Sequence, residues 1–449
     1  MKEAAMTSTA HTCALGPTLS ASRRRFVCTT VGGVIFAALP LAGCSPVAAV
    51  PDSAVAAWFP DASRDDPRRR ALSWAILAPN PHNRQPWLID LTKPDEITVR
   101  IDTTRLLPET DPFGRQILIG TGAMLGLLEI AATSIGYRTE THLFEQGAYG
   151  EHLDSRPLAR IRLAAHDDKA AVSNAAELFA QIPKRRTVRL PYDPARTTDA
   201  RFSKDLGQDL SLAAGASIRA NTSVRAGVIT RNQDPRSADS IARIAKAAWK
   251  IELTTPRLVM ESVNLMRVGS AEIDKYRDGI TMDSFMLVAL DKFGLLDRSK
   301  APTPASSITQ RQIADFDASI DSSPAFFWLT TVGNSRHEQV EAGIAYARAQ
   351  LRATAHGMVM HPLSQSLQEY EEMIELRRDI HREIAAIAAM PTGQSNHEPR
   401  GETRAAGSGD ADRTLQMLCR IGYLPNGVAM PGPAPRRGLE AHIRPERQA

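Results

Sequence analysis

A cluster of arginines with a hydroxyl residue among them gives the clearest sign of chemistry in this sequence. The run Pro183-Lys184-Arg185-Arg186-Thr187-Val188-Arg189 follows the apolar stretch Ala176 to Ile182. A guanidinium group is a rigid fork of donors that meets two phosphate oxygens at once, so this run suits a phosphate monoester. A solvated basic turn is the alternative, and the run Pro435-Arg436-Arg437-Gly438 near the carboxyl end is open to the same two interpretations.

A second segment, Ala78 to Trp87, which we call the amide loop, combines prolines with two asparagines, a histidine and a glutamine. The prolines prevent continuation of the helix that should begin near Asp66-Pro67, so an irregular loop is expected before a strand. Amide side chains on such a loop offer both donors and acceptors, which match the alternating carbonyl and N–H groups along the edge of a flavin. A plain turn between helix and strand is the alternative.

In this order, the three segments resemble those of FMN-dependent nitroreductases. The loop resembles the Pro-Ser-Ser-x-Asn-x-Gln-Pro-Trp signature of that family, and the two basic runs resemble its Arg-Arg-Ser-x-Arg and Pro-x-Arg elements. The length and the Ala-Pro-x-x-His-Asn-x-Gln-Pro-Trp form resemble the Acg-like branch, in which two nitroreductase halves are fused. The resemblance covers roughly residues 66–443, and residues 237–323 match poorly.

The resemblance implies that the two halves share one FMN. Phosphate and ribityl chain would be held from the second half, by Arg185, Arg186, Thr187 and Arg189 with Arg436 or Arg437. The flavin would be reached from the first half by Asn83, supported by Pro79, Asn80, His82 and Gln85. A backbone segment beside the ring would be Pro362-Leu363-Ser364-Gln365.

The resemblance also implies that the reverse site is lost. Arg68-Arg69-Arg70 lacks the following hydroxyl and spaced arginine, and the second half offers only Ala301-Pro302-Thr303-Pro304 in place of the amide loop. Asn80 and Pro81 replace the usual serines and Thr187 replaces another, which alters contacts to the reactive side of the flavin. Hydride chemistry belongs to the cofactor, so neither a catalytic acid or base nor a metal site is predicted.

Two helices that match each other must position these segments. Four small residues recur at a constant offset of 221 residues: Gly122, Ala132, Thr133 and Gly136 match Gly343, Ala353, Thr354 and Gly357. The second helix opens with the capping box Ser335-x-x-Glu338, and Gly357 ends it. Two unrelated core helices or a tandem duplication would both give this pattern.

Runs typical of strands surround the two helices: Trp87 to Leu91, Ile97 to Ile101, Leu158 to Leu163, Phe326 to Val332 and Leu415 to Tyr423. Strands and helices do not alternate strictly, which favours an α+β fold. The resemblance makes this a nitroreductase-like fold duplicated in one chain, a pseudo-dimer of two lobes around central helices. We expect a first lobe over residues 67–180 and a second over residues 181–449.

The second lobe should carry a helical insertion at about residues 237–320 and a flexible loop at about residues 394–412, which is rich in Gly, Ser and charge. The insertion is rich in methionine, at Met260, Met266, Met282 and Met286. Thioethers fill irregular gaps, so these residues either pack a core or close over the cofactor as a lid.

The amino-terminal residues resemble an export address. Ser22-Arg23-Arg24-Arg25-Phe26-Val27 and the apolar run Val31 to Leu41 precede Leu41-Ala42-Gly43-Cys44, as in a twin-arginine signal followed by a lipobox. The apolar run is well short of the roughly 20 residues that span a membrane. Residues 1–44 are therefore predicted to be a signal peptide with lipidated Cys44, and residues 45–66 a linker, in an exported lipoprotein anchored on the periplasmic side.

Composition is consistent with this interpretation. The chain has 43% hydrophobic and 23% charged residues, and its net charge of +4 is spread out, which argues against nucleic-acid binding. Three of the four cysteines lie within the first 44 residues, so Cys419 alone remains in the body and a disulfide framework is excluded.

Three functions remain open from the sequence. The first is an oxidoreductase in which FMN takes hydride from NAD(P)H and passes electrons to a nitroaromatic or quinone-type small molecule. The second is an FMN-sequestering or storage protein of the Acg-like type with little turnover. The third is a lipoprotein whose flavin site has degraded. The chain is expected to act as a monomeric pseudo-dimer, with the twin-arginine machinery and the membrane as its partners.

Overall fold

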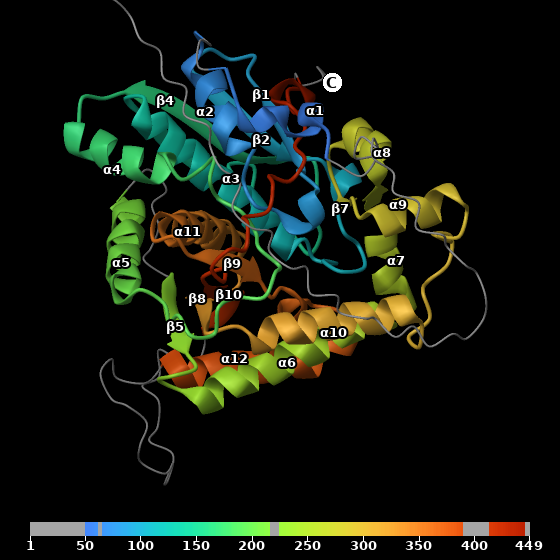
Figure 1. Ribbon diagram of the computed structural model, residues 1–449. Coiled ribbons are helices and arrows are strands. Elements are labelled where there is room, and N and C mark those ends of the chain that lie inside the picture. The colour runs from blue at the N-terminus through green and yellow to red at the C-terminus, as the bar shows by residue number, and fades with distance from the viewer. Residues whose placement is uncertain (1–49, 62–64, 216–223, 389–412, 445–449) are drawn as a thin grey trace, which may run out of the picture. The chain divides into compact units, whose positions relative to one another are not determined.

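The computed structural model describes residues 50–61, 65–215, 224–388 and 413–444 (Figure 1). All of them belong to the compact unit Pro46–Ala449. The predicted export residues Arg23, Arg24 and Cys44 and the predicted flexible loop at residues 394–412 lie outside the described residues. Their roles therefore stay predictions from sequence.

Two four-stranded antiparallel sheets have the same connectivity (Figure 1). The first has the order β1-β2-β4-β3 and consists of β1 (Trp87–Asp90), β2 (Glu96–Ile101), β3 (Tyr137–Leu143) and β4 (Pro157–Ala165). The second has the order β5-β8-β10-β9 and consists of β5 (Arg225–Thr230), β8 (Ala325–Thr331), β9 (Val359–Pro362) and β10 (Thr414–Gly422). In each sheet a long helix joins the second strand to the third, so the second sheet repeats the first.

The joining helices are α3 (Arg115–Ser134) and α11 (Arg336–Ala355), and both ends of α11 lie 221 residues after those of α3. The glycine beyond each helix has positive φ, 84° at Gly136 and 70° at Gly357. The predicted capping box of Ser335 and Glu338 is present at the start of α11. By length and hydropathy α3 could cross a membrane, but most of it is buried, as expected for a core helix.

Contacts between α3 and α11 are nearly symmetric. A Cβ atom placed on Gly122 would lie 2.0 Å from the carbonyl oxygen of Val340, and one on Gly343 would lie 2.0 Å from that of Ile119. The two pairs are related by the same offset of 221 residues, as across a two-fold axis. Together with the repeated sheet topology, this symmetry confirms the predicted α+β fold duplicated in one chain.

Further helices cover the sheets. They are α2 (Pro67–Ala75), α4 (Lys169–Phe179), α5 (Ala200–Gly215), α6 (Pro235–Thr254), α7 (Pro256–Asn264), α8 (Gly269–Tyr276), α9 (Phe285–Lys292), α10 (Ser307–Asp321) and α12 (Ile374–Ala388). Side chains of α6, α10 and α12 share one core cluster with Trp328 of β8 and Leu418 of β10. The outer parts of the predicted insertion therefore cover the second sheet, and its middle contains the short parallel pair β6 (Met266–Val268) and β7 (Ile280–Met282).

The predicted linker at residues 45–66 is wrong for its described part. Residues 52–55 form α1 (Asp52–Val55), followed by the 3₁₀ turn Ala56–Trp58. Trp58 is 2% exposed and belongs to the main core cluster. A linker would leave this large ring in water, whereas here its apolar surface is buried in the core. The folded body therefore begins before Asp66.

The carboxyl-terminal segment crosses from the second sheet back to the first (red in Figure 1). After β10, the Ile89 N–H donates to the His442 carbonyl at 2.9 Å, and the Arg444 N–H donates to the Ile89 carbonyl at 2.8 Å. These residues thus extend the edge of the first sheet although they lie in the range predicted for the second lobe. The crossing carries Arg436 and Arg437 to the loop of Asn83.

Candidate cofactor site

The loop between α2 and β1 has an unusual backbone. His82, Asn83 and Gln85 have φ of 46°, 51° and 48°, a left-handed region that residues other than glycine rarely adopt. Asn80 holds the loop, because its Oδ1 accepts from the Gln85 N–H at 2.7 Å and its Nδ2 donates to the Ala78 carbonyl at 3.1 Å. Strain of this kind persists where the surroundings over-determine it and is frequent at functional sites.

Three guanidinium groups gather on one indole ring that the sequence interpretation had missed. The Cζ atoms of Arg185, Arg186 and Arg436 lie 5.6, 4.8 and 5.4 Å from the centre of the Trp58 ring. Trp58 is held by its own Nε1, which donates to the Ala434 carbonyl at 2.8 Å. The only sequence signal for this role is a tryptophan in an otherwise Ala-, Pro- and Asp-rich segment.

No carboxylate of the described part of the chain pairs with this cluster. Arg185 is 3% exposed and donates to Gln350 Oε1 at 3.2 Å and to the Leu77 carbonyl at 2.9 Å. Arg436, 4% exposed, donates to Asn83 Oδ1 at 2.7 Å. Burial lowers the pKa of Arg185 to about 10 and that of Arg436 to about 9, where neighbouring Arg185 adds to the effect. Buried cations without counter-charge favour an anion as ligand.

Several buried polar atoms of the same region have no hydrogen-bond partner. They are Nε of Arg185, Arg436 and Arg437, Nε2 of Gln350 and Nδ1 of His82. Buried donors nearly always find an acceptor, so unpaired donors at one place indicate a group that the protein alone does not supply. A phosphate offers three acceptor oxygens and a negative charge.

The amide loop and the carboxyl-terminal arginines meet directly. Besides the bond from Arg436 to Asn83, the Arg437 N–H donates to Gln85 Oε1 at 2.9 Å, and its Nη2 donates to the Gln85 carbonyl. Asn83 Nδ2 also donates to the Pro435 carbonyl at 2.9 Å. The segments predicted to converge from the two halves therefore do so.

The arginine run lies beside the predicted backbone segment. Thr187 pairs with Met360 in a parallel bridge, and the Val188 N–H donates to the Met360 carbonyl at 3.1 Å. Pro362 then ends β9, and Leu363, 1% exposed, has its side chain in a core cluster. Ser364 caps the 3₁₀ turn Gln365–Leu367 without using its side chain. The predicted backbone segment therefore lies at the end of β9, next to the arginine run.

Arg189 and His82 complete the predicted set. Arg189 is exposed and makes no hydrogen bond or ion pair within the described residues. Burial, followed by the charges of Arg189 and Arg84, lowers the pKa of His82 to about 4, so this imidazole is neutral at physiological pH. A neutral His82 is a hydrogen-bonding group and not a source of charge.

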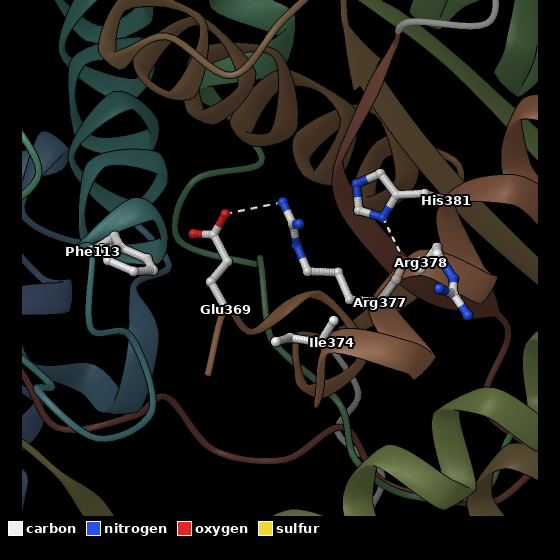
Figure 2. Close-up of a pocket in the computed structure, with 6 residues that line it drawn as sticks. All are labelled: Phe113, Glu369, Ile374, Arg377, Arg378 and His381. Carbon is white, nitrogen blue, oxygen red and sulfur yellow. Dashed lines mark hydrogen bonds and ion pairs between the residues drawn. The ribbon is translucent and has the colours of Figure 1, made fainter. Parts of the chain in front are cut away.

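A surface pocket lies elsewhere and uses none of the predicted site residues. Figure 2 shows its lining, which is Phe113, Glu369, Ile374, Arg377, Arg378 and His381. Glu369 Oε1 accepts from Arg377 at 3.0 Å, and His381 Nδ1 lies 2.7 Å from the Arg377 carbonyl. The strained loop and the unpaired arginines, not this pocket, are the candidate cofactor site.

Curated proteins of Mycobacterium tuberculosis are similar to this chain. The "Putative NAD(P)H nitroreductase Rv3131" is 24% identical over 392 residues, which are 85% of this chain and 91% of that protein. The "Putative NAD(P)H nitroreductase acg" is 31% identical over 127 residues, 28% of this chain and 35% of that protein. No family model matches the chain.

Solved structures with some likeness also include nitroreductases. The FMN-dependent nitroreductase NfnB from Mycobacterium smegmatis is 16% identical, with a TM-score of 0.31 and coverage of 61% of this chain and 99% of that chain. A structure described as "a putative nitroreductase from anabaena variabilis" is 10% identical, with a TM-score of 0.38 and coverage of 82% of this chain and 91% of that chain. Over most of its length, this chain is similar to curated proteins named as NAD(P)H nitroreductases.

Proposed function

We propose that this chain binds one FMN and acts as a nitroreductase-like oxidoreductase, which takes hydride from NAD(P)H and passes electrons to a nitroaromatic or quinone-type acceptor. The observation that carries the proposal is the cluster of buried guanidinium groups without carboxylate partners, in direct contact with a strained amide loop. Similarity to NAD(P)H nitroreductases over 85% of the chain supports it.

The residues present fit FMN. Arg185 and Arg436 would hold the phosphate, because they are buried, close to each other and carry unpaired Nε donors. Asn83 and Gln85 hydrogen-bond the carboxyl-terminal arginines, and they would thereby hold the amide loop where it can face the flavin. FMN supplies hydride acceptance when bound, and the chain supplies position, charge and exclusion of water.

Broken symmetry between the two halves supports a single site per chain. Gln350 of α11 contacts Arg185. With the 221-residue offset, the equivalent position of α3 is Glu129. Glu129 instead forms an ion pair with Arg348 at 3.0 Å, and both side chains are largely buried. At this position an internal ion pair therefore replaces the contact between amide and arginine that the proposed site uses. Residues 301–304, which the sequence offered in place of the amide loop, follow β5 and α9, whereas the amide loop precedes β1, so they do not take its place in the fold.

Purified full-length protein should show a flavin absorbance spectrum with one FMN per chain, and anaerobic NADPH or NADH should bleach it rapidly. Two flavins per chain would contradict the single site. Flavin that stays oxidised would favour the FMN-sequestering alternative. Protein that is colourless and cannot be reconstituted with FMN would overturn the proposal.

Replacing Trp58 by alanine should raise the Kd for FMN about tenfold. The ring faces three guanidinium groups, and each cation–π contact contributes roughly 0.5–2 kcal/mol to their placement. Trp58→Phe should retain most of the affinity. Phe59→Ala is the matched control, because the neighbouring ring is 76% exposed. Fluorescence titration with FMN gives the Kd of all three variants. A Kd of Trp58→Ala equal to that of the wild type would contradict a role of this residue in FMN binding.

We further propose that the protein is exported by the twin-arginine route and anchored through lipidated Cys44, on the periplasmic side. A cofactor site built from segments at both ends of the folded chain supports this route, because such a site must be complete before transport of a loaded protein. Arg23 and Arg24 would be read by the export machinery.

A further inference from the structure

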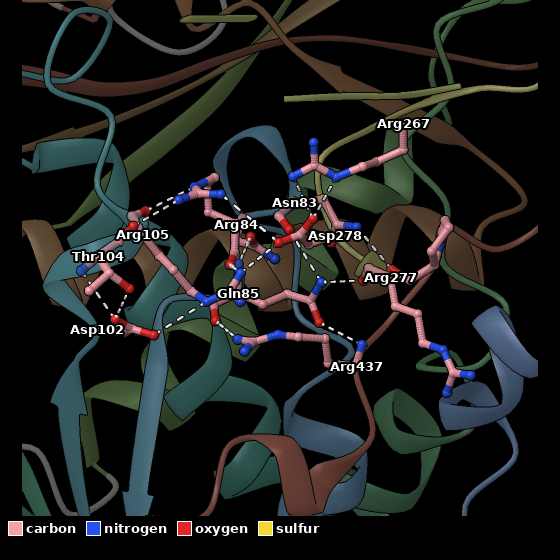
Figure 3. Close-up of polar contacts among 12 residues, drawn as sticks. Asn83, Arg84, Gln85, Asp102, Thr104, Arg105, Arg267, Arg277, Asp278 and Arg437 are labelled. Atoms are coloured by element: carbon pink, nitrogen blue, oxygen red, sulfur yellow. Dashed lines mark hydrogen bonds and ion pairs between the residues drawn. The ribbon is translucent and has the colours of Figure 1, made fainter. Parts of the chain in front are cut away.

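Three consecutive residues of the insertion contact the amide loop. The Arg277 carbonyl accepts from Gln85 Nε2 at 2.8 Å (Figure 3). The Gly279 N–H donates to the Asn83 carbonyl at 3.4 Å. These two backbone contacts lie on either side of Asp278 in the sequence. The segment 277–279, between α8 and β7, is therefore placed against the two loop residues that reach the carboxyl-terminal arginines.

The Asp278 carboxylate is the centre of a buried ionic network (Figure 3). Asp278 is 4% exposed. Its Oδ2 accepts from Arg105 Nη1 at 2.6 Å, and its Oδ1 accepts from Arg267 Nε at 3.0 Å. Arg84 Nη1 lies 3.9 Å from Oδ2. One carboxylate thus faces three guanidinium groups, which come from the amide loop, from the segment after β2 and from β6.

Arg84 links this ionic network to the amide loop, because it is a residue of that loop. It lies between Asn83 and Gln85, and it is fixed further by bonds from Nε to the Arg105 carbonyl at 3.1 Å and from Nη2 to the Thr104 carbonyl at 3.2 Å. Arg105 has one further carboxylate, Asp102, at 3.3 Å. Loss of the Asp278 charge would leave three close cations in a buried place, and their repulsion would push the loop away.

Backbone strain is present on both sides of the contact. Arg277 has φ of 51° and Gly279 has φ of 73°, opposite the left-handed residues of the amide loop. A Cβ atom on Gly279 would lie 2.3 Å from the Leu265 carbonyl, so only glycine fits there. Two strained segments that hydrogen-bond each other are stable only if the surrounding residues hold them in place. Asp278 is suited to this role, because its buried carboxylate belongs to one segment and faces Arg84 of the other.

We propose that Asp278 is a positioning residue of the cofactor site: through Arg84 it holds Asn83 and Gln85 in the conformation that receives the flavin ring. The inference rests on the proposed FMN binding and extends it to a part of the chain that matches the nitroreductase motifs poorly. Asp278 itself touches no ligand. The middle of the insertion thereby contributes to cofactor affinity.

Asp278→Asn keeps the shape of the side chain and removes its charge. We expect the Kd values for FMN and for riboflavin to rise by the same factor, at least tenfold, because the loop faces the ring that both ligands share. At saturating FMN, the visible circular dichroism of the bound flavin should change, which a loss of global stability alone would not cause. Asp274→Asn is the matched control, since it removes an exposed carboxylate that pairs with Arg277 at 2.8 Å.

The outcomes separate this inference from the proposed function. Wild-type protein that binds no flavin would defeat the proposed function. Wild-type protein that binds FMN, with equal Kd and flavin dichroism in Asp278→Asn, would overturn the positioning role. If Asp278→Asn does not fold by far-ultraviolet circular dichroism, Arg84→Gln replaces it, because it leaves Asp278 paired with Arg105 and Arg267. An at least threefold higher Kd in Arg84→Gln supports the role, and an unchanged Kd overturns it.

Discussion

Replacing Arg185 by glutamine is expected to raise the Kd for FMN about a hundredfold. Hydrogen bonds from a charged donor contribute roughly 1.5–3 kcal/mol each, and tenfold in Kd corresponds to about 1.4 kcal/mol. Arg185 is buried and has a free Nε donor, so a phosphate would gain a fully desolvated, charge-assisted contact. Fluorescence titration with FMN and with riboflavin measures the effect, and riboflavin, which has no phosphate, should lose little.

Although Arg185→Gln should weaken FMN binding, it should not lower the thermal stability of the protein without FMN. Burial lowers the pKa of Arg185 in the folded state, so the protonated form is less favourable there than in the unfolded chain over the whole range below about pH 10. Without FMN, Arg185→Gln should therefore melt at the wild-type temperature or higher. Lys184→Ala, at the exposed neighbouring position, should leave the Kd unchanged. A parallel loss of riboflavin and FMN affinity in Arg185→Gln would contradict a phosphate contact.

Substituting alanine for Gly122 or Gly343 should cost about 3 kcal/mol or more, or prevent folding, because the new methyl group would meet backbone on the facing helix. At both positions the nearest atom is a carbonyl oxygen 2.0 Å away, which cannot rotate aside as a side chain would. The approach of α3 to α11 would have to widen along its length. Urea unfolding of each variant measures the loss.

Alanine substitutions at two other glycines serve as controls for the loss of stability in Gly122→Ala. Gly126→Ala places a methyl group 3.2 Å from Ile344 and should cost clearly less than Gly122→Ala. Gly207 lies inside α5 with open space around it, so Gly207→Ala should stabilise the protein by roughly 0.5–1 kcal/mol through helix propensity. Equal stability of Gly122→Ala and wild type would mean that the two central helices are not in contact at this point.

The sequence was most informative where local signals were strong. The five strand-like runs became β1, β2, β4, β8 and β10, and α2 begins at Pro67, where a helix was expected to begin near Asp66-Pro67. The shared offset of Gly122 and Gly343 left two explanations open, and the structure decides for duplication, because the close approach of the two helices admits only glycine at both positions. The convergence of Asn83 with Arg436 was predicted from family motifs, since no local pattern connects residues 353 positions apart.

The missed elements depend on tertiary contacts. β3, β5 and β9 have mixed patterns and gain their pairing from neighbours. Trp58 lies in a segment of linker-like composition, and its burial depends on arginines far along the chain. Asp278 is one acid among many in the sequence, and only the folded chain shows that three arginines surround it. Such residues carry no spacing or periodicity from which to infer a role.

The return of the carboxyl-terminal segment to the first sheet has a consequence for biosynthesis. Arg436 leaves the ribosome 353 residues after Asn83, its partner in the candidate site. Domains otherwise begin to fold as their amino-terminal parts emerge. For the proposed FMN site this means that the site is complete only after Arg436 has emerged, so a chain cut before this residue should not retain flavin, and its flavin content would show whether synthesis has passed this point.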